Sequence, residues 1–214
     1  MDLCKSELNG INLLSDKDLM IYSVGISSAG VAELEMIKRN PKRHIVATTI
    51  DEKGVEETKK LVEDKNLNNN IEVKLEDVSK PLPYSNEYFD YIYARLVLHY
   101  LDNQSLENTL KEIYRVLKAD SVFYLVVRSD KCDDNTRYKQ GFDEKTGITT
   151  IFYPDQNVTR YRRFHNKESI TDFLTKAGFT VSNIEEYSEQ LYIDYSRTKV
   201  SNNEDILIQV TAKK

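Results

Sequence analysis

The sequence predicts a doubly wound α/β fold, in which a mostly parallel sheet carries helices on both faces. Three observations indicate this class. Short apolar runs alternate with stretches of helical period over most of the 214 residues. Hydrophobic residues make up 40% and charged residues 30% of the chain, a balance typical of globular domains. Strands separated by helices of this length form right-handed βαβ crossovers, which build a parallel sheet.

The first 129 residues carry five predicted strands and three predicted helices. The strands are short and rich in β-branched and aromatic residues, and they span 19–24, 44–50, 71–75, 89–94 and 121–127. The helices show apolar residues at helical spacing and span 31–38, 54–64 and 106–117. These elements alternate as a doubly wound fold requires.

The pattern changes after Ser129. Residues 130–165 are polar and aromatic, with turn signals on both sides of the weakly alternating run 148–153. We therefore predict an insertion that forms a β-hairpin or substrate lid. The chain then closes with one capped helix and two strands, at 166–177, 180–187 and 205–212. The prediction is one domain, residues 1–214, with a seven-stranded Rossmann-like sheet and the insertion 130–165.

Composition argues against several classes of protein. No run approaches the roughly 18 apolar residues of a membrane span, and the N-terminus lacks the basic start and apolar core of a secretory signal. The net charge of −5 gives no general attraction to nucleic acid or anionic membranes. Cys4 and Cys132 match neither a disulfide framework nor a metal knuckle, so we expect free thiols in a reducing cytoplasm and no metal site.

The loop after the first strand is the first candidate for ligand binding. In such sheets, ligands bind beyond the carboxyl ends of the strands, where the strand order reverses. This loop reads Ser23-Val24-Gly25-Ile26-Ser27-Ser28-Ala29-Gly30. Small residues let backbone approach a ligand, and the following helix offers free N–H groups. Ordinary strand-to-helix turns use the same residues, so the loop alone does not decide the function.

The order of motifs along the chain resembles the class I S-adenosylmethionine-dependent methyltransferases. The matching segments are Leu75-Glu76-Asp77-Val78, Leu82-Pro83-Tyr84, 88–93, Leu98-His99-Tyr100 and 114–118. The family carries an aspartate after the third strand, a Leu-Pro turn, a Phe-Asp pair opening the fourth strand and an Arg-Val-Leu-Lys helix end. Asp90 is expected to shape that fourth strand rather than to touch ligand. The resemblance covers roughly residues 19 to 129 and implies S-adenosylmethionine as cofactor, with a small-molecule acceptor.

The resemblance also implies cofactor-binding roles at the matching positions. Gly25 and Ser27 would line the turn beside the methionine portion of the cofactor. Asp77 and the backbone of Val78 would face the adenine, whose exocyclic amine can donate to a carboxylate. Ala94 would lie close to the transferred methyl group.

Two departures from the family pattern concern the cofactor. The first motif of the family begins with an acidic residue and contains three spaced glycines, whereas this chain has Ser23 at the acidic position and Ser27 and Ala29 at two glycine positions. The acidic residue that holds the ribose corresponds to Thr49, with Asp51 two residues later, and we assign both to the cofactor. These departures keep open the alternative of an inactive domain that serves as a binding or regulatory subunit.

The acceptor is expected beyond the fourth strand. His99 follows that strand and is the candidate general base, with a packing role as the alternative. Arg95 and Arg128 stand just past strand ends and predict an anionic acceptor that Arg95 helps to position, with ordinary salt bridges as the alternative. Tyr192 and Tyr195, in the connection between the last two strands, are predicted to cover the substrate pocket or else to pack against the insertion.

Two further functions are disfavoured. A nicotinamide-dependent oxidoreductase would need the dinucleotide spacing of glycines, which residues 25–30 lack. The segment 160–165 interleaves basic and aromatic residues, as single-stranded nucleic-acid sites do, but it is short and lies in an acidic chain. We place it at the edge of the lid and expect no nucleic-acid partner.

Overall fold

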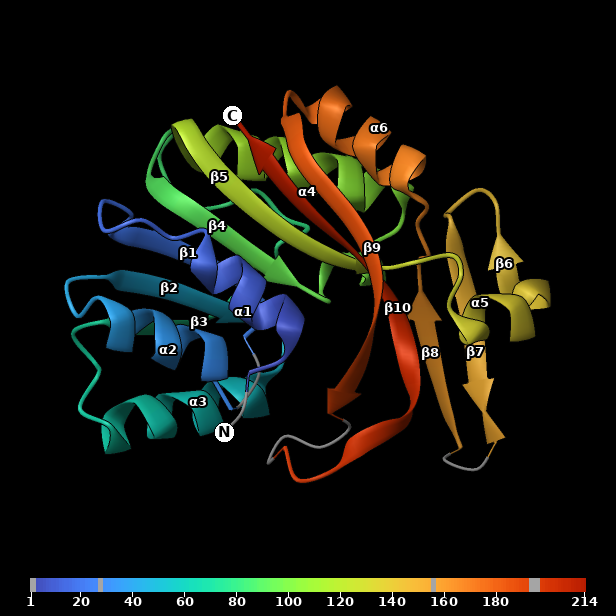
Figure 1. The fold of residues 1–214 in the computed structure, drawn as a ribbon, viewed down its shortest axis with the longest axis horizontal. Coiled ribbons are helices and arrows are strands. Elements are labelled where there is room, and N and C mark those ends of the chain that lie inside the picture. Colours follow the sequence, from blue (N-terminus) through green and yellow to red (C-terminus); the bar gives the residue numbers. More distant parts are fainter. Residues whose placement is uncertain (1–2, 27–28, 155–156, 193–196) are drawn as a thin grey trace.

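Seven strands form one sheet in this computed structural model, which describes residues 3–26, 29–154, 157–192 and 197–214. The strands are β1 (Met20–Val24), β2 (His44–Thr49), β3 (Ile71–Leu75), β4 (Phe89–Arg95), β5 (Leu117–Arg128), β9 (Thr180–Tyr192) and β10 (Val200–Lys213). Their order is β3-β2-β1-β4-β5-β10-β9 (Figure 1). The first five pair in parallel, and β10 runs antiparallel to both β5 and β9. The predicted doubly wound α/β class is confirmed.

Helices cover both faces of the sheet (Figure 1). They are α1 (Lys5–Asn12), α2 (Val31–Arg39), α3 (Glu52–Asp64), α4 (Asn103–Val116) and α6 (Lys167–Ala177), with a short 3₁₀ turn η1 (Leu98–Tyr100). Because successive strand residues point to opposite faces, Ile21 and Tyr91 join the core under α1, α2 and α3. Their neighbours Tyr22 and Ile92 join the core under α4 and α6. All four side chains are at most 1% exposed.

Residues 130–165 form a larger unit than the predicted hairpin. Three antiparallel strands, β6 (Phe142–Asp143), β7 (Ile148–Tyr153) and β8 (Val158–Arg162), make a second sheet in the order β6-β7-β8. The short helices α5 (Asp133–Arg137) and η2 (Lys139–Gly141) precede it. The Arg163 N–H donates to the His99 carbonyl at 2.7 Å, and the Asn103 N–H donates to the Thr146 carbonyl at 2.9 Å. The insertion is thereby attached beside η1 and the start of α4.

Several predicted boundaries need correction, among them the start of β5 at Leu117 rather than at 121, and helix α1 was missed. Helix α1 was not predicted, because its eight residues include Gly10 and few apolar side chains. Gly10 is required there, since a Cβ atom would lie 2.6 Å from the Tyr124 ring and 2.7 Å from the Tyr93 ring. The last two strands are also longer than predicted: β9 continues to Tyr192 and β10 begins at Val200, so Tyr192 ends a strand rather than lying in a loop. Their outer parts lack the apolar alternation by which strands are recognised.

Asp90 has the structural role expected of it. Its carboxylate accepts hydrogen bonds from the Met20 N–H at 2.7 Å and the Leu19 N–H at 3.1 Å, and it pairs with Lys118 at 2.5 Å. These contacts fix the starts of β1, β4 and β5 relative to one another. The opposite ends of the same strands are therefore held in register, at the edge where the strand order reverses and ligands bind in this fold class.

None of the helices in the described residues is long and apolar enough to cross a membrane. Cys4 and Cys132 are both free and buried. Burial is the main factor that raises the pKa of Cys4, to about 11, so its thiol stays protonated near neutral pH. Among the described residues no group of three or more metal-binding side chains is found.

Candidate functional site

Two adjoining cavities lie at the carboxyl ends of β1 and β4. The larger has a volume of about 510 Å³ and the smaller of about 270 Å³. Val24, Gly25, Leu96 and Tyr100 line both cavities, so one ligand can extend from one into the other. The larger cavity alone falls within the range of about 300–1,000 Å³ that is typical of small-molecule sites.

The shared wall is made by unusual backbone. Gly25 has φ +78°, and a Cβ atom there would lie 2.7 Å from the Val97 Cγ2 atom. Its N–H donates to the Thr48 carbonyl at 2.9 Å, which turns the chain across the end of β2. Leu96, on the other side, has φ 56° although it is not a glycine. Backbone of this kind is concentrated at functional sites.

Asp77 and Val78, which the resemblance assigns to the adenine, both line the smaller cavity. Asp77 Oδ1 accepts from the Ser79 N–H at 2.9 Å, and Oδ2 has no hydrogen-bond partner among the described residues. Glu76 also lines this cavity and was not predicted to do so. Its carboxylate accepts from the hydroxyls of Tyr22 at 2.5 Å and Tyr84 at 2.8 Å, which hold it at the end of β3.

The other assigned cofactor residues take different places. Thr49 lines the smaller cavity, and its Oγ1 atom accepts from the Asp51 N–H at 3.2 Å. Asp51 lines neither cavity; it caps α3 by accepting from the Lys53 N–H at 3.2 Å. Ala94 is fully buried in the core beneath the cavities rather than on their walls. Ser27 lies outside the described residues.

One end of the larger cavity is basic. Arg128, Arg160, Arg162 and His99 line it. Arg128 pairs with Asp205, and Arg162 pairs with Asp134 at 2.9 Å. The Nε atoms of both arginines, and both ring nitrogens of His99, are nevertheless buried and have no hydrogen-bond partner among the described residues. Since buried polar groups are nearly always hydrogen-bonded, these unpaired atoms point to a polar ligand.

His99 is held in its neutral form. Burial is the largest cause that lowers its pKa well below the ordinary value, and the charges of Arg128, Arg162 and His165 lower it further. A neutral imidazole offers one donor and one acceptor nitrogen. The ring can therefore orient a ligand by hydrogen bonds, while its proton affinity is low unless a negative charge enters beside the arginines.

Two carboxylates, Glu7 and Glu33, and the Tyr93 side chain also line the larger cavity, together with Arg95 and Arg197. The Ser23 hydroxyl donates a hydrogen bond to the Glu33 carboxylate at 2.5 Å. Burial raises the pKa of Glu33. The Tyr93 hydroxyl is buried and has no partner in the described part of the chain. Glu7, Glu33 and Tyr93 were missed in the sequence, where only Ser23, at the acidic position of the family motif, gave a signal.

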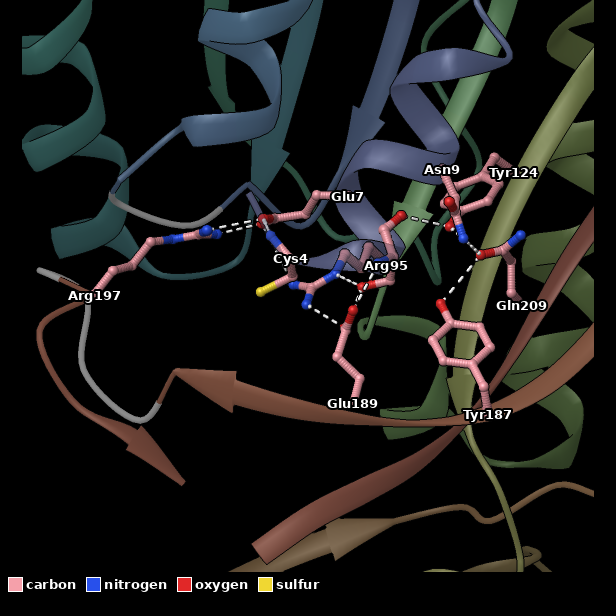
Figure 2. A network of polar contacts seen from close by, with 10 residues as sticks. Cys4, Glu7, Asn9, Arg95, Tyr124, Tyr187, Glu189, Arg197 and Gln209 are labelled. Carbon is pink, nitrogen blue, oxygen red and sulfur yellow. Dashed lines mark hydrogen bonds and ion pairs between the residues drawn. The ribbon is translucent and has the colours of Figure 1, made fainter. Parts of the chain in front are cut away.

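Arg95 is bound by carboxylates from two other elements (Figure 2). Its Nε–H donates to Ser6 Oγ at 2.6 Å, and its Nη atoms lie 3.6 Å from Glu7 and 3.3 Å from Glu189. Arg197 pairs with the same Glu7. Arg95 lines the larger cavity. Its guanidinium forms salt bridges that join β4 to α1 and β9, which was the alternative to a role in binding the acceptor.

A family model described as a methyltransferase domain matches residues 24–125. This match is consistent with the class I, S-adenosylmethionine-dependent methyltransferases, which the order of motifs in the sequence resembles. No curated protein matches the chain in sequence.

Solved structures show the same fold around this methyltransferase domain. An S-adenosylmethionine-dependent methyltransferase from Methanosarcina mazei is 20% identical with a TM-score of 0.79, covering 100% of this chain and 99% of its own. The 1,6-didemethyltoxoflavin-N1-methyltransferase from Burkholderia thailandensis, solved with its substrate and S-adenosylhomocysteine, is 14% identical with a TM-score of 0.65, over 98% of this chain and 78% of its own. A protein from Pyrococcus horikoshii is 15% identical with a TM-score of 0.69, over 98% and 90%.

Tyr192 and Tyr195 are the remaining residues that were predicted to contact the substrate. Tyr192 lines the larger cavity at the end of β9, and the Arg197 guanidinium lies 5.1 Å from the centre of its ring. Tyr195 lies outside the described residues. Tyr192, His99 and Arg128 thus meet at one cavity, although they are up to 93 residues apart in the chain. Arg160 and Arg162 were predicted as a lid edge and line this cavity too.

Proposed function

We propose that this methyltransferase transfers a methyl group from S-adenosylmethionine to a small, anionic acceptor in the cytoplasm. The observation that carries the proposal is the basic end of the larger cavity, where buried arginine and histidine nitrogens have no partner. Guanidinium groups prefer carboxylate and phosphate as partners. The two free cysteines support a reducing compartment.

The smaller cavity fits the adenosine portion of the cofactor. Its lining is apolar except for a few polar groups, which is typical of nucleoside sites. Asp77 Oδ2 would accept from the adenine amine beside the Val78 backbone, and the Thr49 hydroxyl would contact the ribose. Gly25 lets the chain pass close to the cofactor where a Cβ atom would collide with Val97. Asp51 would serve indirectly, by fixing the start of α3.

The bound cofactor would supply an electrophilic methyl group on a sulfonium. The chain's own residues would hold the acceptor in line with that methyl group and exclude water, which supplies much of the acceleration in such reactions. Arg128 and Arg162 would bind the negative charge of the acceptor. His99 would hydrogen-bond the nucleophilic group, and a negative charge on the acceptor would raise its proton affinity toward that of a general base. The insertion, residues 130–165, would close the cavity through Arg160 and Arg162.

The test is isothermal titration of the purified protein with S-adenosylhomocysteine, after removal of co-purified nucleotide. We expect micromolar binding, and about tenfold weaker binding for Asp77→Ala, because one hydrogen bond to a charged acceptor is lost. Asp64→Ala, on the exposed end of α3, is the matched control and should bind as the wild type does.

Two results would argue against the proposal. Unchanged affinity in Asp77→Ala would refute the adenine assignment. An absence of binding up to millimolar concentration would favour the alternative, an inactive domain that acts as a binding or regulatory subunit.

A further inference from the structure

Glu33 is a buried carboxylate on a cavity wall that makes no salt bridge with the described residues. It is 4% exposed and lines the larger cavity. The Ser23 hydroxyl, at 2.5 Å, is its side-chain partner. Burying a carboxylate is costly, and burial raises the pKa of Glu33; the nearby charge of Arg197, which pairs with Glu7, offsets only part of that cost. A cationic group of a ligand would remove that cost.

A second, independent observation lies beside it. The Tyr93 hydroxyl, near the end of β4, is buried and has no hydrogen-bond partner in the part of the chain that the structure describes, and Tyr93 lines the same cavity. Glu7, the other carboxylate that lines this cavity, already pairs with Arg95 and Arg197. Glu33 is therefore the carboxylate that is left for a ligand, with the Tyr93 oxygen as a second acceptor.

The position of Glu33 relates it to the departure in the first motif. Ser23 lies at the strand position where the family has an acidic residue. Its hydroxyl donates a hydrogen bond to Glu33, which lies in the first turn of α2. The short serine side chain leaves room for the carboxylate from the helix. Glu33 of α2 thus supplies a carboxylate near the place where the family has one on the strand, from a position ten residues later in the chain.

We propose that the Glu33 carboxylate, together with the Tyr93 hydroxyl, binds the α-ammonium group at the amino-acid end of the cofactor. This inference rests on the proposed function. A ligand with its adenine in the smaller cavity passes Gly25 to enter the larger one, since both cavities share that residue. The loop that it passes leads directly into α2, which carries Glu33. The arginines at the basic end remain available to the acceptor.

The experiment compares three ligands by isothermal titration. They are S-adenosylhomocysteine, its analogue without the α-amino group, and 5′-methylthioadenosine, which has no amino-acid end. The wild type should prefer S-adenosylhomocysteine over the deaminated analogue by about tenfold or more. Glu33→Gln should lose this preference while binding 5′-methylthioadenosine as before. Tyr93→Phe should weaken the same preference, and Glu35→Gln, on the same helix and paired with Lys38 and Arg39, should preserve it.

The outcomes separate this inference from the proposed function. Glu33→Gln keeps a side-chain oxygen that can accept the hydrogen bond from Ser23. The double variant S23D/E33Q places a carboxylate on the strand instead, and it should restore part of the preference for the α-amino group. Equal affinities of wild type and Glu33→Gln for S-adenosylhomocysteine would overturn the inference, as would an equal loss for all three ligands. Failure of the wild type to bind any of the three would instead overturn the proposed function, and this inference with it.

Discussion

Gly25 holds a backbone position that another residue could take only by moving its neighbours. A substitution to alanine adds a Cβ atom 2.7 Å from Val97 at a φ of +78°, so the loop must shift. We expect Gly25→Ala to lower the free energy of unfolding by about 1–3 kcal/mol. The affinity for S-adenosylhomocysteine should fall by about tenfold or more, because both cavities lose their shared wall. Urea denaturation and titration calorimetry measure the two effects.

Gly30→Ala is the matched control for this prediction. Gly30 also has positive φ, at +52°, but the nearest atom to an added Cβ is Leu61 Cδ2 at 3.5 Å, an ordinary contact. Gly30→Ala should therefore lower the free energy of unfolding through backbone strain alone, without a steric collision of the kind that Gly25→Ala has with Val97. Val97→Ala combined with Gly25→Ala should recover part of the stability. If the two glycine variants behave alike, the collision with Val97 is not what fixes Gly25.

The protonation state of His99 can also be predicted. Because burial and the charges of Arg128 and Arg162 lower its pKa well below the ordinary value, the ring should stay neutral between pH 5.5 and 8 in the free protein. Nuclear magnetic resonance of protein labelled at histidine would show no shift of the His99 signal over that range, with His99→Asn providing the assignment. A midpoint near 6.5 would contradict the electrostatic account.

Helix α1 is the element that ties the amino-terminal part of the chain to the last two strands. Glu7 is 4% exposed and pairs with Arg95 and Arg197, and Ser6 donates to Glu189 at 2.5 Å (Figure 2). Burial alone would raise the pKa of Glu7, but Arg197 and Arg95 outweigh it and lower the pKa. Glu7→Gln removes a buried charge from this network and should destabilise the fold by about 3 kcal/mol in urea denaturation.

Glu112→Gln serves as the comparison for that prediction. Glu112 pairs with Arg115 at 2.8 Å on the half-exposed side of α4, and surface pairs of this kind contribute at most about 1 kcal/mol. A loss in Glu7→Gln that is no larger than in Glu112→Gln would show that the network around Arg95 does not stabilise α1.

The helices and strands differ in how well the sequence predicts them. Strands β1, β2 and β4 were found because they are buried on both faces and read as apolar runs between helices, and β3 because its apolar residues alternate. Helix α1 was not predicted because Gly10 and its polar side chains weaken the helical spacing of apolar residues. Gly10 is nevertheless needed there, since a side chain would collide with the Tyr93 and Tyr124 rings. The outer parts of β9 and β10 were not predicted because they lack a regular alternation of apolar residues, although their backbones pair with each other.

The candidate site was only partly predictable for a related reason. Asp77, Val78 and Gly25 follow strands directly, so the fold class places them at the ligand edge. Glu33 and Tyr93 line the cavity through contacts made by folding, and nothing in their local sequence marks them. Arg95 was placed correctly along the chain, but its partners Glu7 and Glu189 come from elements distant in the sequence.

The whole molecule should be sensitive to mild acid because two of its histidines are buried. Burial is the main cause that lowers the pKa of His99 far and that of His165 to about 3. The unfolded chain binds protons at these rings below pH 6.5, while the folded chain does not, so stability falls as the pH falls. Each ring should cost about 2 kcal/mol between pH 7 and pH 5.

His165→Gln isolates this contribution in urea denaturation at the two pH values. The loss of stability on going from pH 7 to pH 5 should shrink by about 2 kcal/mol relative to the wild type. The raised pKa of Glu33 acts in the opposite sense in both backgrounds, so it cancels in the comparison. An unaltered loss in His165→Gln would contradict the prediction.

The place of β10 in the sheet has a consequence for how the chain is made. Strand β10, residues 200–213, lies between β5 and β9, so β9 joins the sheet only through a strand that is synthesised after it. Until residue 213 has left the ribosome, β5 presents an open edge of unpaired N–H and carbonyl groups to any extended chain nearby. The sheet is therefore closed by a late, long-range step, which favours slow folding and exposes the nascent chain to aggregation. A chaperone that covers the β5 edge during synthesis would protect this protein at its most vulnerable moment.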